Sequence, residues 1–158
     1  MKRLLILFLA LFVNPLWAQQ DKVEAFAHAI ARTEGFYMRG SLPARCHNPG
    51  DLKVMAKGGT YPGQIGVCKA GHVKFRNDAA GYSALYHQID KMLEGESKFY
   101  RQEMNLWQIG KMYAQNSRRW ATNMGKNLGV PPGTTLEDYF DLPPRVKPQV
   151  QPCPIKEY

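Results

Sequence analysis

Residues 21–35 read DKVEAFAHAIARTEG, and this stretch decides the fold of the domain. Its apolar residues recur at the three- and four-residue spacing of one helical face, which predicts a helix over residues 21–33 with one buried side. These residues are Val23, Phe26, Ala27, Ile30 and Ala31. Gly35 is expected to end the helix. The same spacing leads to residue 34, so a glutamate continues the apolar face.

Glu34 is unusual for two physical reasons. Burial on an apolar face removes water from its carboxylate, and the last turn of a helix places it at the negative end of the helix dipole, which costs about 0.3–1 kcal/mol. Both effects raise the pKa of the carboxyl group. An acid that stays protonated near neutral pH is suited to general-acid catalysis. The alternative is that the helix frays early and Glu34 points to water, and periodicity alone does not separate the two.

The rest of the chain predicts an α+β domain, mostly helical, with a small β-hairpin element after the first helix. Glycines, prolines and two cysteines between residues 36 and 77 indicate a loop-rich segment. Short strands are expected at residues 51–55 and within 64–75, turning at Ala70-Gly71. Later helices are expected from the N-cap Asp78 to Gly95, over 106–114, over 118–128 between the N-cap Ser117 and Gly129, and for one turn at 135–140.

The first eighteen residues are typical of a signal peptide. Lys2 and Arg3 precede an apolar run over residues 4–13, and Ala18 offers a cleavage point. The run is shorter than the roughly 20 residues that a membrane span needs, although a retained anchor is the alternative. We expect an exported protein, periplasmic or extracellular, without stable membrane insertion after cleavage. It would comprise a catalytic domain over residues 19–140 and a proline-rich tail over 141–158.

The 158-residue chain is basic. Its net charge of +8 becomes +6 when Lys2 and Arg3 leave with the signal peptide. A basic surface attracts nucleic acid, anionic lipid or acidic cell-wall polymers. Export makes nucleic acid the least suitable of these partners, and solubility alone would also explain the charge.

The cysteines are Cys46, Cys68 and Cys153. In an oxidising compartment we expect a Cys46–Cys68 disulfide, worth roughly 3 kcal/mol. Cys153 would then be free, bridge to another chain, or replace one of the pair. Zinc binding by Cys46-His47 and Cys68-x₃-His72 is an alternative, but adjacent ligands suit one tetrahedral ion poorly. A further alternative to the disulfide is a cysteine nucleophile with a neighbouring histidine as its base. No metal or other cofactor is expected.

Several short motifs follow Glu34-Gly35 in order along the chain. They are Arg45-Cys46-His47-Asn48-Pro49-Gly50-Asp51-Leu52, Phe75 before Asn77-Asp78, Gly81-Tyr82-x-Ala84-Leu85 with Gln88, Gly95-x-Ser97 and Tyr100, Tyr113, Trp120 with Asn123, and Leu128-Gly129-Val130. Over about residues 25–138 the series resembles the lysozyme-like lytic transglycosylases, in particular the group found in phage structural proteins and small exported bacterial proteins. It departs from the better-known soluble transglycosylases and goose-type lysozymes, because no Glu-Ser pair ends the first helix and no Gly-Leu-Met-Gln segment follows.

The resemblance implies a lysozyme-like fold and cleavage of the MurNAc–GlcNAc β-1,4 bond of peptidoglycan. Glu34 would act as general acid and then as base, while the sugar's own 6-hydroxyl closes a 1,6-anhydro ring. A lysozyme-type muramidase would instead need a second carboxylate, for which Asp51 is the candidate. A non-catalytic peptidoglycan-binding protein of the same fold is the third possibility.

Four residues are expected to bind substrate: Asn48, Asp51, Gln88 and Tyr113. Asn48 and Asp51 also suit a structural role, because these residue types commonly shape turns. A tyrosine in the equivalent late helix lines the site in the resembled families, although core packing would also explain Tyr113. Trp120 is expected in the core, and Tyr61 either stacks on a sugar or belongs to a loop.

Overall fold

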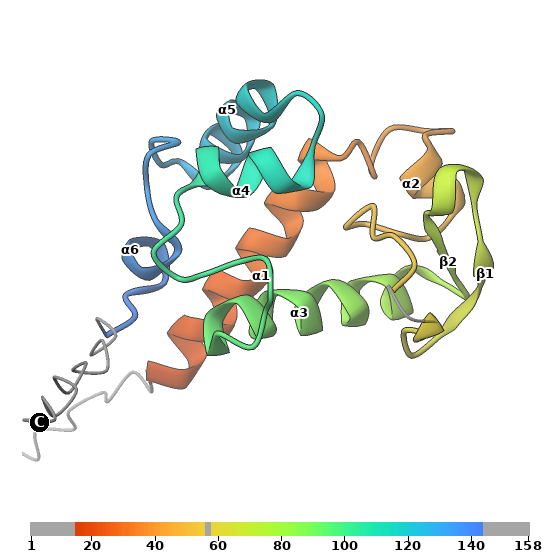
Figure 1. Cartoon of the computed structure of the whole chain (residues 1–158), viewed down its shortest axis with the longest axis horizontal. Coiled ribbons are helices and arrows are strands. Elements are labelled where there is room, and N and C mark those ends of the chain that lie inside the picture. The colour runs from red at the N-terminus through yellow and green to blue at the C-terminus, as the bar shows by residue number, and fades with distance from the viewer. Residues whose placement is uncertain (1–14, 56–57, 144–158) are drawn as a thin grey trace, which may run out of the picture.

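Helix α1 (Pro15–Thr33) runs through the middle of the helical part of the domain, between α3 and α5 (Figure 1). The computed structural model describes residues 15–55 and 58–143. The apolar face expected of this helix is buried, as predicted: Val23, Phe26, Ala27, Ile30 and Ala31. Within the described residues the helix extends back to Pro15, beyond the start predicted at residue 21.

Four further helices complete the helical part of the domain. They are α3 (Asp78–Glu94), α4 (Leu106–Tyr113), α5 (Ser117–Leu128) and α6 (Leu136–Phe140). Helices α3 and α5 pack on α1, and α4 packs on α5. Each contributes to one apolar core: Phe26, Ile30, Leu85, Ile89, Ile109, Met124 and Phe140. The prediction of a mostly helical α+β domain is confirmed.

The helix ends follow the sequence signals with two corrections. Gly95 and Gly129 end α3 and α5 in the left-handed conformation, as predicted. The N-caps, however, are Asn77 and Asn116, and not the next residues along the chain. Each asparagine side chain accepts a bond from a main-chain N–H three residues on.

A small lobe holds the β-structure (Figure 1). Strands β1 (Gln64–Val67) and β2 (Val73–Phe75) pair antiparallel, and the predicted turn at Ala70-Gly71 is confirmed, with both residues at positive φ. The strand expected at residues 51–55 is wrong, since only Lys53 forms an isolated bridge, with His72. A short helix α2 (Leu42–Arg45), capped by Ser41, was not predicted.

Three features hold this lobe together and attach it to α3. A disulfide joins Cys46 to Cys68, as predicted, and a second small core forms between Leu52, Val73, Phe75, Ala80 and Ala84. Helix α3 also approaches the turn over residues 47–50 very closely at Gly81. A Cβ there would lie 2.0 Å from the carbonyl oxygen of His47 and 2.6 Å from Pro49, so only glycine fits.

Predictions about the chain ends fall mainly outside the described residues. Residues 1–14 and 144–158 hold most of the expected signal peptide and tail, including Cys153, and Ala18 lies in α1. Among the helices within residues 15–55 and 58–143, none is both long and apolar enough to cross a membrane. The same residues contain no group of three or more histidine, cysteine or acidic side chains that could hold a metal ion.

Candidate active site

Glu34 lies directly after α1, at a helix end with a fixed geometry. The N–H of Gly35 bonds to the carbonyl of Arg32 at 3.1 Å. The N–H of Phe36 bonds to the carbonyl of Ala31 at 2.8 Å. This pair of bonds, with Gly35 at φ 76°, is the Schellman arrangement. It fixes the direction in which the Glu34 side chain leaves the helix, so early fraying does not describe this end.

The Glu34 carboxyl group is largely buried and has one strong hydrogen bond. Trp120 Nε1 donates to Glu34 Oε1 at 2.6 Å. Burial raises the pKa of Glu34 from 4.5 to about 7, the Trp120 bond partly opposes this shift, and the charge of Asp51 adds to it. Near neutral pH the group is therefore present in both protonation states, as an acid that becomes a base requires.

The turn over residues 48–51 faces this carboxyl group, and Asn48 holds it from inside. The Asn48 side chain is 0% exposed. Its amide donates to the carbonyls of Leu52 (2.9 Å) and Val73 (3.0 Å), and its oxygen accepts from the Leu52 N–H (2.8 Å). Every polar atom of the side chain is thus bonded to the main chain. Asn48 does not line the cleft, and its bonds are those of the structural alternative.

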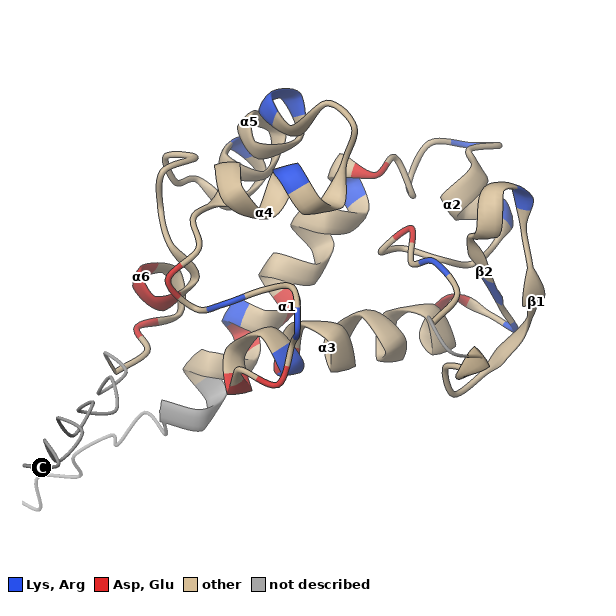
Figure 2. Ribbon diagram, in the orientation of Figure 1, with Lys and Arg blue, Asp and Glu red and all other residues tan. Residues whose placement is uncertain are grey.

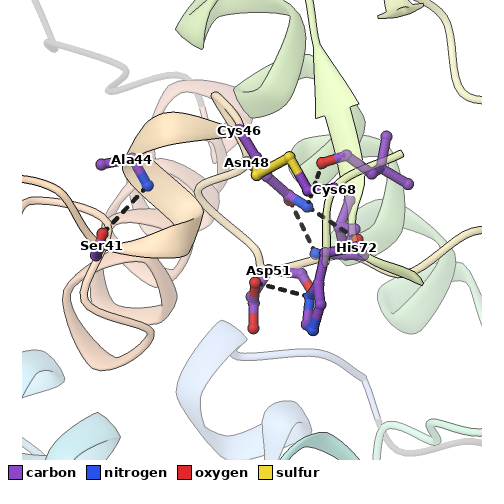
Figure 3. The surroundings of a disulfide bond; sticks show 9 residues. Ser41, Ala44, Cys46, Asn48, Asp51, Cys68 and His72 are labelled. Atoms are coloured by element: carbon purple, nitrogen blue, oxygen red, sulfur yellow. Dashed lines mark hydrogen bonds and ion pairs between the residues drawn. A yellow bond between two sulfur atoms is a disulfide. The ribbon is translucent and has the colours of Figure 1, made fainter. Parts of the chain in front are cut away.

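Asp51 follows in the same turn, with φ at 48°. Its main-chain N–H bonds to the carbonyl of Asn48 at 3.0 Å. His72 Nδ1 lies 3.1 Å from the Asp51 carbonyl oxygen and 2.8 Å from Oδ1 (Figure 3). A carbonyl oxygen only accepts, so Nδ1 carries the hydrogen. Burial raises the pKa of Asp51, and the nearby His72 and Lys53 oppose that shift.

Tyr113 and Tyr100 form an aromatic wall beside Glu34. The Tyr113 ring stacks on Trp120 at 5.0 Å between centroids, and its hydroxyl donates to the Gly50 carbonyl at 2.7 Å. Burial first and the Glu34 charge second raise the pKa of Tyr113 well above its usual value and that of Tyr100 to about 12. Tyr113 thereby links the indole that holds Glu34 to the turn that carries Asp51.

These groups open into one cleft of about 560 Å³. Of the predicted site residues, Glu34, Asp51, Gln88 and Tyr113 line it. Its other lining residues include Lys53, Tyr61, His72, Phe99, Tyr100, Lys111 and Met112. Phe99 and Met112 are 63% and 44% exposed and form apolar parts of the lining. The cleft therefore combines two acids of raised pKa, Glu34 and Asp51, with aromatic, apolar and cationic walls.

Comparisons with protein-family models, with curated proteins and with solved structures gave no match. The chemistry of the cleft thus rests on its geometry.

Two residues that line the cleft, His72 and Tyr100, and the buried Trp120 that bonds to Glu34 were not predicted as functional. Trp120 was expected only in the core, and it is buried at 4% exposure, but its indole N–H turns to Glu34. His72 was considered only as a zinc ligand, an alternative that fails because Cys46 and Cys68 are bonded to each other. Tyr100 carried no signal beyond its place in the motif series. Tyr61, weighed as a stacking residue, lies in the cleft and packs its ring against Phe75.

Proposed function

We propose that this protein cleaves the glycan strands of peptidoglycan at the β-1,4 bond between MurNAc and GlcNAc, as a lytic transglycosylase. The observation that carries the proposal is the pKa of about 7 at Glu34, a buried acid at the wall of a cleft large enough for sugar rings. The resemblance of the motif series from Glu34 to Val130 to lytic transglycosylases gives the substrate class.

In the proposed reaction Glu34 first protonates the oxygen that links two sugars, and the bond from that oxygen to C1 of MurNAc breaks. The 6-hydroxyl of the same MurNAc then attacks C1, and the Glu34 carboxylate removes its proton. The products are a 1,6-anhydro end and a free 4-hydroxyl, and Glu34 returns to its protonated state. The Trp120 indole stabilises the carboxylate that exists between the two proton transfers.

The burial of Asp51 Oδ1 favours this route over hydrolysis. Activation of a water molecule needs a carboxylate oxygen that reaches the water, whereas Asp51 Oδ1 is buried in a tight turn, 2.8 Å from His72 Nδ1 and without a hydrogen bond. A muramidase remains the second candidate, because Asp51 lines the same cleft and its charge acts on Glu34. A glycan-binding protein without activity is the third, and it gives no reason for an acid of raised pKa in the cleft.

The deciding experiment incubates the purified protein with isolated peptidoglycan and analyses the released sugars by mass spectrometry. We expect anhydro-muramyl ends, lighter by one water than the reducing ends that a muramidase releases. Glu34→Gln should bind peptidoglycan and release nothing. Glu24→Gln, the same change at an exposed position of α1, is the matched control and should remain active. An active Glu34→Gln protein, or a wild-type protein that binds without turnover, would contradict the proposal.

A further inference from the structure

A second pocket lies between α4 and α5. Its volume is about 600 Å³, comparable to that of the cleft. Helix α4 contributes Trp107 and Lys111, and helix α5 contributes Ser117, Arg118 and Thr122. Trp107 and Lys111 are four residues apart, as are Arg118 and Thr122, so one edge of each helix faces the pocket.

The two helices that form this pocket carry cations and no acid. Their basic residues are Lys111, Arg118, Arg119 and Lys126, and neither helix contains aspartate or glutamate (Figure 2). Lys111 and Arg118 line the pocket, and both side chains are exposed. An anionic ligand placed between them would meet two positive charges and no opposing carboxylate from either helix.

Trp107 gives the pocket an apolar surface of the size of a sugar ring. The side chain is partly buried, because it packs against the main core, and it also lines the pocket. An indole held in this way offers a rigid face for the C–H side of a sugar. The hydroxyl of Thr122 donates to the Arg118 carbonyl at 2.9 Å, which leaves its oxygen able to accept a bond from a ligand hydroxyl.

The pocket adjoins the cleft, because Lys111 lines both. A polymer that occupies the cleft beside Met112 and Tyr113 can therefore continue past Lys111 into the second pocket. A ligand that suits both sites is a long chain of sugars with carboxylates at intervals, which is the chemistry of a glycan strand with acidic peptide stems.

We propose that the pocket is a second binding site for peptidoglycan, in which a sugar ring stacks on Trp107 and a carboxylate pairs with Lys111 and Arg118. The proposal rests on the proposed function for the identity of the strand. Two linked sites on one polymer raise the overall affinity well beyond that of either alone. The pocket thus favours long or insoluble strands carrying carboxylates over short neutral oligosaccharides.

The test measures binding without turnover, in the Glu34→Gln background. Arg118→Gln is combined with it, and Arg119→Gln is the matched control, since Arg119 is the exposed neighbour outside the pocket. The ligands are solubilised glycan strands with intact peptide stems and neutral N-acetylglucosamine oligomers. Arg118→Gln should weaken binding of the acidic strands by about threefold to tenfold. It should leave binding of the neutral oligomers unchanged, and Arg119→Gln should leave both unchanged.

Trp107→Ala should weaken binding of long acidic strands as well, with circular dichroism to check that the fold is retained. If it unfolds, the Arg118 and Arg119 pair still decides the question. Equal binding by those two variants would overturn the second site even when wild-type protein cleaves peptidoglycan. A contrary outcome is that short single-stranded DNA displaces the acidic strands from the protein with the wild-type pocket but not from Arg118→Gln. That result would overturn the glycan assignment and identify the pocket as a nucleic-acid site. Failure of the proposed function is read separately, as an absence of released sugars from wild-type protein.

Discussion

The indole of Trp120 and the carboxyl group of Glu34 form a hydrogen bond of 2.6 Å between residues that are 86 positions apart in the chain. The bond favours the ionised carboxylate, and burial favours the neutral acid more strongly, so the pKa is about 7. Helix α5 therefore lowers a pKa that burial raises at the end of α1.

The pH dependence of activity should report this balance. Above pH 7 the general acid is lost, and the rate should fall about tenfold for each pH unit. Trp120→Phe removes the bond that favours ionisation, so the pKa of Glu34 should rise and the alkaline limb should move to higher pH. Tyr139→Phe is the control, because Tyr139 packs against the main core and lines neither the cleft nor the second pocket. A limb that moves to lower pH in Trp120→Phe would contradict this assignment of the bond.

Glu34 should also make the stability of the wild-type protein depend on pH. Its pKa is raised on folding from 4.5 to about 7, so the folded state holds more protons than the unfolded state between these values. The free energy of unfolding should therefore decrease by about 3 kcal/mol as the pH rises from below 4.5 to above 7. Glu34→Gln, which can still accept the Trp120 bond, should lack this decrease.

Urea unfolding at pH 4 and at pH 8 measures the effect directly. Glu34→Gln should exceed the wild type in stability at pH 8, and the difference should become small at pH 4. An equal difference at both values would mean that the carboxyl group titrates normally in the folded protein.

Asp51→Asn separates the two catalytic candidates. Asparagine adopts the left-handed conformation of this position readily, so the turn should persist. A transglycosylase should keep its rate within about tenfold, whereas loss of a general base typically costs 10²–10⁴-fold. The pKa of Glu34 should fall, because the Asp51 charge raises it, and the alkaline limb should shift downward. The measurement is the rate of sugar release over a range of pH, with the mass of the product at each point.

Tyr113→Phe tests the link between the aromatic wall and the turn. The change removes the bond to the Gly50 carbonyl and should lower the free energy of unfolding by about 1–3 kcal/mol, because a buried acceptor loses its partner. The rate of sugar release should fall more than the affinity for glycan, because the ring that stacks on Trp120 is retained. The substitution removes only the hydroxyl, so an unchanged rate would show that this bond has no role in positioning the turn.

The fold was predictable from the sequence wherever local chemistry decides it. The stripe from Val23 to Ala31 and the stops at Gly95 and Gly129 are properties of neighbouring residues. The two wrong N-caps arose because two suitable residues stand side by side, Asn77 before Asp78 and Asn116 before Ser117. The choice between them depends on main-chain angles set by the preceding loop, which composition does not reveal.

The site was predictable in part for the same reason. Glu34 violates the pattern of its own helix, so its sequence neighbours reveal it. The roles of Trp120 and His72 depend on partners 86 and 21 positions away. An indole in an apolar stripe indicates core packing, and only the packing of α5 against α1 directs its N–H to the carboxyl group. Asn48 was ambiguous because one amide suits a turn and a ligand equally well.

The anchoring of the turn from three sides restricts how this protein can diversify. Asn48 bonds it to β2, the disulfide joins it to the end of β1, and Gly81 brings α3 against its back. An insertion or deletion there has to satisfy all three constraints at once. Phe99 and Met112 also line the cleft but are exposed, so we expect substitutions there to change the cleft surface while disturbing little else.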